Sequence, residues 1–175
     1  MRIAVSGTHG SGKSTLIEEL SALLPKYETV DEPYHLLLED GHEFSHPPSL
    51  EDFAAQLDRS IEELSDDGAD VLFDRCPLDF VAYISVHADA DAFDLEEWLP
   101  RLRAAVETLD LIVFVPVEAP DRITLASSDD DDSRAVVDET LKELLLEDSL
   151  DLGVEVLEVE GEVARRVSTV MRRIR

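Results

Sequence analysis

The chain of 175 residues suits one domain, and its composition, 44% hydrophobic and 32% charged, is that of a globular protein rather than a disordered one. A formal net charge of −26 makes nucleic-acid backbones and anionic membranes unfavourable partners, because the field of the protein would repel both. No apolar run reaches the roughly 18 residues that a membrane-spanning helix needs, and the single cysteine, Cys76, permits no internal disulfide, so we expect a cytoplasmic protein.

The first half of the chain alternates short apolar runs with helical patterns, as βα units around a parallel sheet do. A first strand is predicted at residues 3–5, and a glycine loop and an amphipathic helix follow it. Residues 29–30 close a short second strand that leads into the sequence Asp-Glu-Pro at 31–33. Ser49 and Asp52 have the spacing of a capping box, which predicts the start of another helix.

The second half continues the alternation and predicts the remaining elements. They are strands at 71–73, 111–115 and 154–159, and helices after Pro77, at 98–106, at 137–145 and at 163–174. Residues 121–134 look polar and loop-like, and the last helix is expected to leave Arg165, Arg166, Arg172 and Arg173 mostly outside. Five short strands with intervening helices predict a three-layer α/β domain with a five-stranded parallel sheet.

The sequence G-x-x-x-x-G-K-[ST] at residues 7–14 is the strongest functional signal. Its glycines let the backbone turn so that N–H groups face phosphate oxygens, and the following helix adds the positive end of its dipole. Lys13 would reach the β- and γ-phosphates, and the Ser14 hydroxyl would help to hold Mg²⁺. Loop filling is a better interpretation of His9 than catalysis. The expected nucleotide-binding residues are Gly7, Thr8, His9, Gly10, Ser11, Gly12, Lys13, Ser14 and Thr15.

Charged residues follow the second and third predicted strands, whose carboxyl ends should open on the same edge as the glycine loop. Asp74 is placed to orient Mg²⁺ or its waters, and Arg75 to supply positive charge near the phosphates or the acceptor. A carboxylate at Glu32 can accept the proton of an attacking hydroxyl, as phosphoryl transfer to an alcohol requires. Asp31 could take this role instead, and a solvated loop carboxylate is the alternative for either residue.

Four segments together resemble a family of P-loop kinases: GTHGSGKST at 7–15, DEP at 31–33, DRCPLDFVAY at 74–83 and FVPVEAPDR at 114–122. The likeness is greatest to AAA-family ATPases and kinases related to the ribosylnicotinamide kinase part of NadR. Deoxynucleoside and thymidylate kinases are more distant. The resemblance implies a P-loop NTPase fold of the nucleoside and nucleotide kinase-like type over residues 1–175, with ATP and Mg²⁺ as cofactors.

The resemblance also assigns roles to single residues. In deoxynucleoside kinases a Glu-Pro after the second strand supplies the general base, and Glu32-Pro33 matches it. An acidic residue and an arginine follow the third strand of those kinases, as Asp74-Arg75 does here. The family implies a mobile lid, expected at about residues 121–134, with Arg122 and Arg134 as its phosphate-contacting arginines.

Three further features bear on the acceptor and the lid. Gln56 matches a glutamine that faces the acceptor base in deoxynucleoside kinases, and it lies on the flank of its helix near Phe53, from which it can reach a cleft. Arg59 points almost opposite the apolar stripe of that helix, which favours solvent over substrate. The four aspartates at 129–132 are expected to form a solvent-facing turn rather than a metal site.

These residues predict a small-molecule kinase that transfers the γ-phosphate of Mg·ATP to a hydroxyl of a nucleoside-like acceptor. Its expected catalytic residues are Lys13, Glu32, Asp74, Arg75, Arg122 and Arg134, its metal ligands Ser14 and Asp74, and its acceptor-binding residues Glu32, Gln56 and Arg75. A regulatory ATPase or NTP switch is one alternative. A nucleoside-monophosphate kinase is another, and it would need Arg101 and Arg103 to border the cleft. The sequence leaves a homodimer open.

The excess of acidic residues, 41 Asp and Glu against 15 Lys and Arg, is expected to form a solvated surface. High salt would favour such a surface because it screens the self-repulsion. In a chain this acidic, the few arginines that face a cleft are the only local means of holding an anionic ligand.

Overall fold

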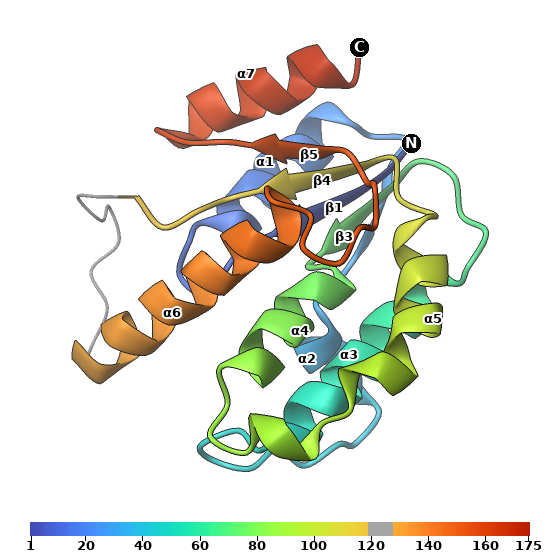
Figure 1. Ribbon diagram of the computed structural model, residues 1–175. Helices are drawn as coiled ribbons and strands as arrows, with labels where there is room; N and C mark the ends of the chain where they lie inside the picture. Colours follow the sequence, from blue (N-terminus) through green and yellow to red (C-terminus); the bar gives the residue numbers. More distant parts are fainter. Residues whose placement is uncertain (119–127) are drawn as a thin grey trace.

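The computed structural model describes residues 1–118 and 128–175, in which a parallel sheet lies between two layers of helices (Figure 1). Its strands are β1 (Arg2–Ser6), β2 (Glu28–Val30), β3 (Val71–Asp74), β4 (Leu111–Phe114) and β5 (Val156–Glu158). All neighbours pair in parallel, in the order β2–β3–β1–β4–β5. The predicted α/β fold with a five-stranded parallel sheet is therefore confirmed.

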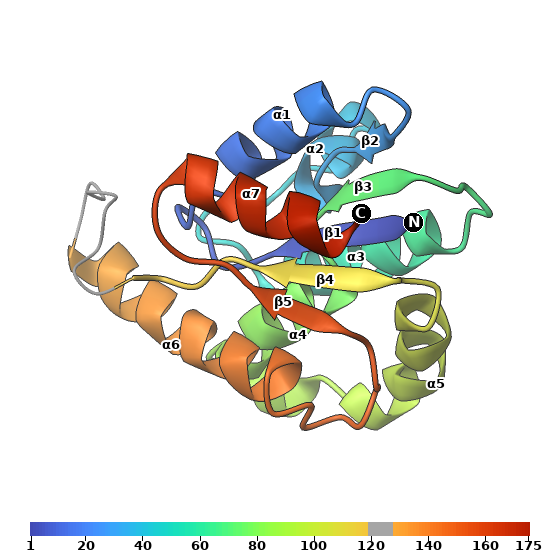
Figure 2. The ribbon, with the colours of Figure 1, turned by 90° about the horizontal axis from the view of Figure 1, so that it is seen from above.

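Two helices cover one face of the sheet and four cover the other (Figure 2). The first layer consists of α1 (Lys13–Leu23) and α7 (Val163–Arg173). The second consists of α3 (Leu50–Leu64), α4 (Pro77–Ser85), α5 (Leu95–Val106) and α6 (Ser128–Leu145). The short helix α2 (Pro33–Glu39) follows β2 and packs beside α3.

The central strands β1, β3 and β4 are mostly apolar and buried because both faces of the sheet are covered there. Side chains alternate between the faces, so Ile3 and Val5 pack with α1 and α7, whereas Ala4 packs with the opposite layer. On β4, Leu111 likewise packs with α1 and α7, and Ile112 packs with the opposite layer. This packing fixes β1 at the centre of the sheet, and the glycine loop leaves from its carboxyl end.

Helix α3 begins where the capping box predicted it. The Asp52 N–H donates to Ser49 Oγ at 3.1 Å, and the Ser49 N–H donates to the Asp52 carboxylate at 2.9 Å. The prediction missed α2, a helix of seven residues that is too short to show a helical period. Pro33 occupies its first turn, where the fixed φ of proline suits a helix start.

The lid predicted at residues 121–134 lies only partly within the described residues, and Arg122 lies outside them. From Ser128 the chain belongs to α6, so the loop predicted through residue 134 and the turn predicted at 129–132 are wrong there. Aspartate has a weak helix propensity, which makes such a run look like a loop. Near a helix N-terminus, however, its negative charge interacts favourably with the helix dipole.

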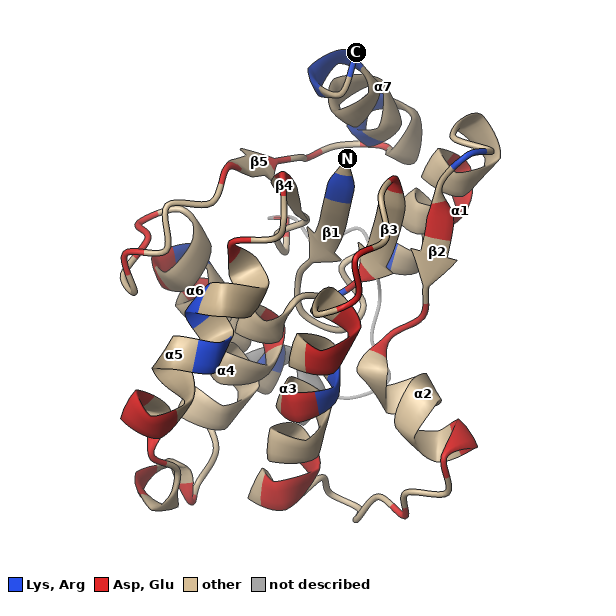
Figure 3. Cartoon of the chain, turned by 90° about the vertical axis from the view of Figure 1, so that its right-hand side faces the viewer, with Lys and Arg blue, Asp and Glu red and all other residues tan. Residues whose placement is uncertain are grey.

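Acidic residues are spread over the helices and connecting loops, and basic residues are few (Figure 3). Within the described residues, no helix has both the length and the apolar character needed to cross a bilayer. Most of the acidic residues are exposed, so the large negative charge is carried mainly by the surface, where like charges repel one another.

We predict that the stability of the protein rises with salt. The net charge is −26, and the distance over which exposed charges interact falls from about 10 Å at 0.1 M salt to about 3 Å at 1 M. Between these KCl concentrations the thermal unfolding midpoint, followed by circular dichroism, should rise by about 5 °C or more. A midpoint that stays constant or falls would show that surface repulsion does not limit the stability.

Candidate functional site

The glycine loop connects β1 to α1 at the carboxyl edge of the sheet. Gly10 and Gly12 have φ values of 65° and 91°, in the left-handed region that glycine adopts without strain. A Cβ atom added to Gly7 would lie 2.5 Å from the carbonyl oxygen of Val115, so a side chain there would displace the backbone. The loop therefore has the tight turn that the phosphate-binding motif requires.

Two arginines from distant parts of the chain bind the carbonyl groups of this loop. Arg134 of α6 donates to His9 O at 2.9 Å and to Gly10 O at 2.8 Å. Arg166 of α7 donates to Ser11 O at 2.9 Å. Because Arg134 is 1% exposed and Arg166 8%, both positive charges are buried against the loop, where they favour an anionic ligand.

The position of Arg166 corrects the prediction that this side chain lies outside. It forms an ion pair with Glu118 at 2.9 Å, and Glu118 also accepts the N–H of Gly161 at 2.6 Å. Arg166 follows Val163 by three residues and precedes Val170 by four, which places it on the apolar face of α7. That spacing was a signal in the sequence that the prediction overlooked.

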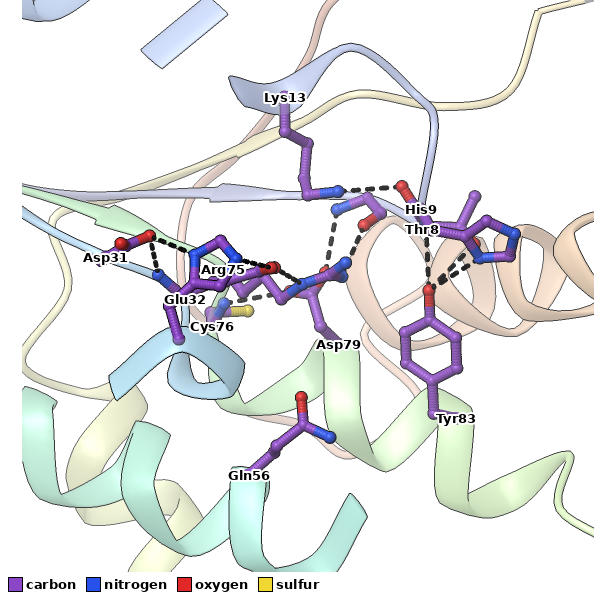
Figure 4. A network of polar contacts seen from close by, with 12 residues as sticks. Thr8, His9, Lys13, Asp31, Glu32, Gln56, Arg75, Cys76, Asp79 and Tyr83 are labelled. Carbon is purple, nitrogen blue, oxygen red and sulfur yellow. Dashed lines mark hydrogen bonds and ion pairs between the residues drawn. The ribbon is translucent and has the colours of Figure 1, made fainter. Parts of the chain in front are cut away.

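A buried carboxylate, Asp79, joins the loop to the start of α4 (Figure 4). It accepts the N–H of Gly7 and the N–H of Cys76, each at 3.0 Å, and it lies 3.3 Å from Nη1 of Arg75. Burial and the charge of Asp79 raise the pKa of the Cys76 thiol well above its usual value, so the thiol is neutral. Sequence reasoning missed Asp79, although it is the single charged residue of an otherwise apolar helix.

Tyr83 lies one helical turn beyond Asp79 and was also missed. Its hydroxyl accepts the N–H of His9 at 3.0 Å and lies 3.2 Å from the Thr8 hydroxyl. Asp79 and Tyr83 thus share one face of α4, and that face is turned toward the glycine loop (Figure 4). Their spacing of four residues was the available signal.

Lys13 is almost fully buried beneath the loop, where its ammonium group donates to Thr8 O at 2.9 Å. Burial and the neighbouring charge of Arg75 lower the pKa of Lys13 to about 7. An anionic ligand beside Lys13 would restore its charge, because opposite charges favour the ionised form. The residue is therefore suited to bind phosphate.

Ser14 and Asp74 line the same cavity of about 400 Å³, together with Asp31. Among the described residues, the Oδ1 atom of Asp74 is buried and has no hydrogen-bond partner. Burial raises the pKa of Asp74 to about 6, although Lys13 and Arg75 oppose this shift. An unpaired carboxylate oxygen and a nearby hydroxyl are the hard oxygen donors that Mg²⁺ prefers, so the donor set fits this ion.

Arg75 brings Glu32 to the edge of the loop. Its φ of 77° lies in the left-handed region, which costs a non-glycine residue about 1–3 kcal/mol. In this conformation Nε donates to Glu32 at 2.8 Å and Nη1 to Gly7 O at 3.1 Å. Asp31 is exposed and accepts the Glu32 N–H at 2.8 Å. Its carboxylate lies 3.1 Å from Nδ1 of His35, and Nε2 of that histidine lies 3.7 Å from the Glu32 carboxylate.

Gln56 and Arg59 occupy different environments on α3. Gln56 is 7% exposed, donates to Asp52 O at 3.2 Å and directs its amide toward the group around Arg75 and Asp79 (Figure 4). Arg59 forms an ion pair with Asp40 at 2.8 Å, away from the loop, in agreement with its predicted orientation. The structure thus places Gln56, but not Arg59, beside the predicted site.

Comparisons with known proteins give one family and several related folds. A sequence model of the AAA domain matches residues 2–166, whereas comparison with curated proteins gave no match. Deoxyadenosine kinase from M. mycoides with bound dATP has a TM-score of 0.65 and 19% identity over 99% of both chains. NadR in complex with NAD and AMP-PNP has a TM-score of 0.66 and 18% identity over 97% of this chain and 48% of its own. Thymidylate kinase from Candida albicans has a TM-score of 0.63 and 15% identity over 98% of this chain and 89% of its own.

The substitution Asp74→Asn tests the buried carboxylate. The pKa of Asp74 in the folded protein, about 6, lies above its ordinary value of 3.8. Protonation of Asp74 therefore stabilises the fold fully below about pH 3.8, and this stabilisation is lost as the pH rises through 6. In ligand-free protein, Asp74→Asn should raise the free energy of unfolding by about 1–3 kcal/mol at pH 8 and by roughly half of that at pH 5.

Urea unfolding at both pH values measures this difference. Asp67→Asn removes a charge from an exposed loop and is the matched control, with an expected change below about 0.5 kcal/mol. An Asp74→Asn protein that gains no more stability at pH 8 than at pH 5 would contradict the raised pKa.

The substitution Arg166→Gln tests how the loop is held. Loss of the buried ion pair between Arg166 and Glu118 should lower the free energy of unfolding by about 2–4 kcal/mol. Loss of the contact to Ser11 O should weaken Mg·ADP binding about tenfold in calorimetry. Arg172→Gln changes an exposed arginine of the same helix and should leave both quantities nearly unchanged. Equal effects of the two variants would refute the role of Arg166.

Proposed function

Because the chain belongs to the AAA domain family and has the fold of P-loop nucleoside and nucleotide kinases, we propose that it is an ATP-dependent kinase. Its reaction would transfer the γ-phosphate of Mg·ATP to a hydroxyl of a small nucleoside-like acceptor. The chain spans about half the length of NadR, so the proposal draws only on the part of NadR that this chain matches. The homodimer and the cytoplasmic location remain predictions.

The ion pair of Glu32 and Arg75 is the observation that carries this proposal. A carboxylate that accepts a proton from the acceptor must lie beside the phosphate that is transferred. Arg75 contacts both Glu32, at 2.8 Å, and the carbonyl oxygen of Gly7, at 3.1 Å. One guanidinium therefore holds the candidate base next to the phosphate-binding loop.

The other residues have roles that follow from their positions. Residues 7–15 would hold the triphosphate of ATP, and Ser14 and Asp74 would hold Mg²⁺. When bound, this ion neutralises charge on the β- and γ-phosphate oxygens. Lys13 and Arg134 would stabilise the charge that develops during transfer, because both are buried beside the loop. Arg122 stays a candidate lid arginine outside the described residues.

The surroundings of the arginines favour an uncharged hydroxyl acceptor over a monophosphate. Arg101 pairs with Asp58 at 2.5 Å and lies over the ring of Trp98, and Arg103 donates to backbone carbonyls of residues 150–151. Neither residue lines the cavity that contains Ser14 and Asp74. Within the described chain, the arginines proposed for an acceptor phosphate are therefore engaged elsewhere.

An acceptor screen tests the proposal. The protein is incubated with Mg·ATP and a panel of nucleosides and their monophosphates, and ADP release is followed by a coupled assay. We expect release that depends on a nucleoside. Release with monophosphates alone would identify a nucleoside-monophosphate kinase, and release that requires only a protein partner would identify a regulatory ATPase.

The substitution Glu32→Gln separates proton transfer from nucleotide binding. The amide keeps a hydrogen bond to Arg75 but accepts no proton, so kcat should fall by about 10²–10⁴-fold. Mg·ADP binding, measured by calorimetry, should change less than about twofold, since residues 7–15 are untouched. Glu39→Gln, at the exposed carboxyl end of α2, the helix that Glu32 precedes, is the control and should retain full activity. Unchanged turnover in Glu32→Gln would eliminate Glu32 as the base.

A further inference from the structure

The hydroxyl of Tyr83 binds the outer part of the glycine loop through three contacts. It accepts the N–H of His9 at 3.0 Å, and it lies 3.2 Å from the Thr8 hydroxyl and 3.3 Å from Nδ1 of His9. A phenol has a single proton to donate, which either of these last two atoms can accept. The hydroxyl thus fixes the two residues that precede Gly10 in the loop.

The ring of Tyr83 is held from the other side of the site. It stacks on Phe53 of α3 with a centroid distance of 5.2 Å and an interplanar angle of 5°. The guanidinium carbon of Arg75 lies 5.7 Å from the ring centroid, within the range of a cation–π contact. Aromatic pairs of this kind are favourable beyond their buried area. Phe53 of α3 and Arg75 therefore hold the ring of Tyr83, and with it the position of the hydroxyl.

Both neighbours of the ring belong to the acceptor side of the proposed site. Phe53 precedes Gln56 by three residues on the same helix, so the two side chains lie on adjacent parts of one face. Arg75 is paired with Glu32, the proposed base. A movement of α3 or of this ion pair would shift the tyrosine ring, and the hydroxyl would transmit the shift to His9.

We propose that Tyr83 is a positioning residue that couples the acceptor side of the site to the phosphate-binding loop. The inference rests on the proposed function for the identity of the acceptor side. A phenylalanine at this position would fill the same space and keep both the stack on Phe53 and the ring contact with His9, whose centroid lies 6.5 Å away. The hydroxyl is therefore the part of the side chain that adds the hydrogen bonds of the link. Coupling of this kind is reciprocal: a nucleotide on the loop also stabilises the position of Phe53.

A double-mutant cycle on Mg·ADP affinity tests the coupling without any acceptor. Tyr83→Phe removes the three hydroxyl contacts and should weaken Mg·ADP binding by about 3–10-fold. Phe53→Leu removes the ring that stacks on Tyr83. It should weaken Mg·ADP binding about threefold when Tyr83 is present and less than about 1.5-fold in Tyr83→Phe.

Tyr27→Phe is the matched control, because it removes a tyrosine hydroxyl from the residue that precedes β2, at the edge of the sheet opposite the glycine loop. Its Mg·ADP affinity should equal that of the wild type. Thermal unfolding of every variant shows whether the fold is intact, and Phe53→Met replaces Phe53→Leu in the cycle if the latter fails to fold. Once an acceptor is known, Tyr83→Phe should lower kcat severalfold and leave the acceptor KM within about twofold.

Two results would overturn the inference. Tyr83→Phe could bind Mg·ADP as tightly as Tyr27→Phe, which would leave the hydroxyl without a role. Alternatively, Phe53→Leu could weaken binding equally in both backgrounds, which would make the two residues independent. The protein could show coupling between Phe53 and Tyr83 and yet phosphorylate no acceptor. That result would refute the proposed kinase activity and leave the positioning role of Tyr83 intact, so failure of one proposal can be told from failure of the other.

Discussion

The arrangement of the site depends on the buried carboxylate of Asp79. A charge without access to water is tolerated only where hydrogen bonds and an opposite charge compensate the lost hydration. Three structural units supply that compensation. The glycine loop contributes the N–H of Gly7, the start of α4 the N–H of Cys76, and the turn after β3 the guanidinium of Arg75. None of these units can move without breaking a hydrogen bond to a buried anion, so their relative positions are fixed before any ligand binds.

Arg75 extends this constraint to the candidate base. Its strained backbone is held by the same network, and its side chain reaches from Asp79 and the loop to Glu32. Strain at such a position is stable only when the surrounding contacts determine the conformation. The acceptor side and the phosphate side of the proposed reaction are thus linked through one residue, and Tyr83 adds a second connection between them.

The charge distribution explains how a protein with a net charge of −26 could hold a triphosphate. Lys13, Arg134 and Arg166 are buried around the glycine loop, and Arg75 lies beneath it. Most acidic residues are exposed, where water and salt screen them. Because the interior screens charges less than water does, a few buried cations can outweigh many exposed anions in the field at the loop.

The sequence by itself determined the features that have a local signature. The glycine spacing identified the loop, apolar runs identified the five strands, and the residues that end two of these runs identified Glu32, Asp74 and Arg75 as candidates. Such patterns are visible because strand ends of a parallel sheet meet at one edge. Only the tertiary structure showed that Asp79, Tyr83 and Arg166 bind the loop, because their partners lie 72, 74 and 155 residues away along the chain. A single buried polar side chain shows no partner in a sequence, and packing of the helices against the sheet decides which backbone group it meets.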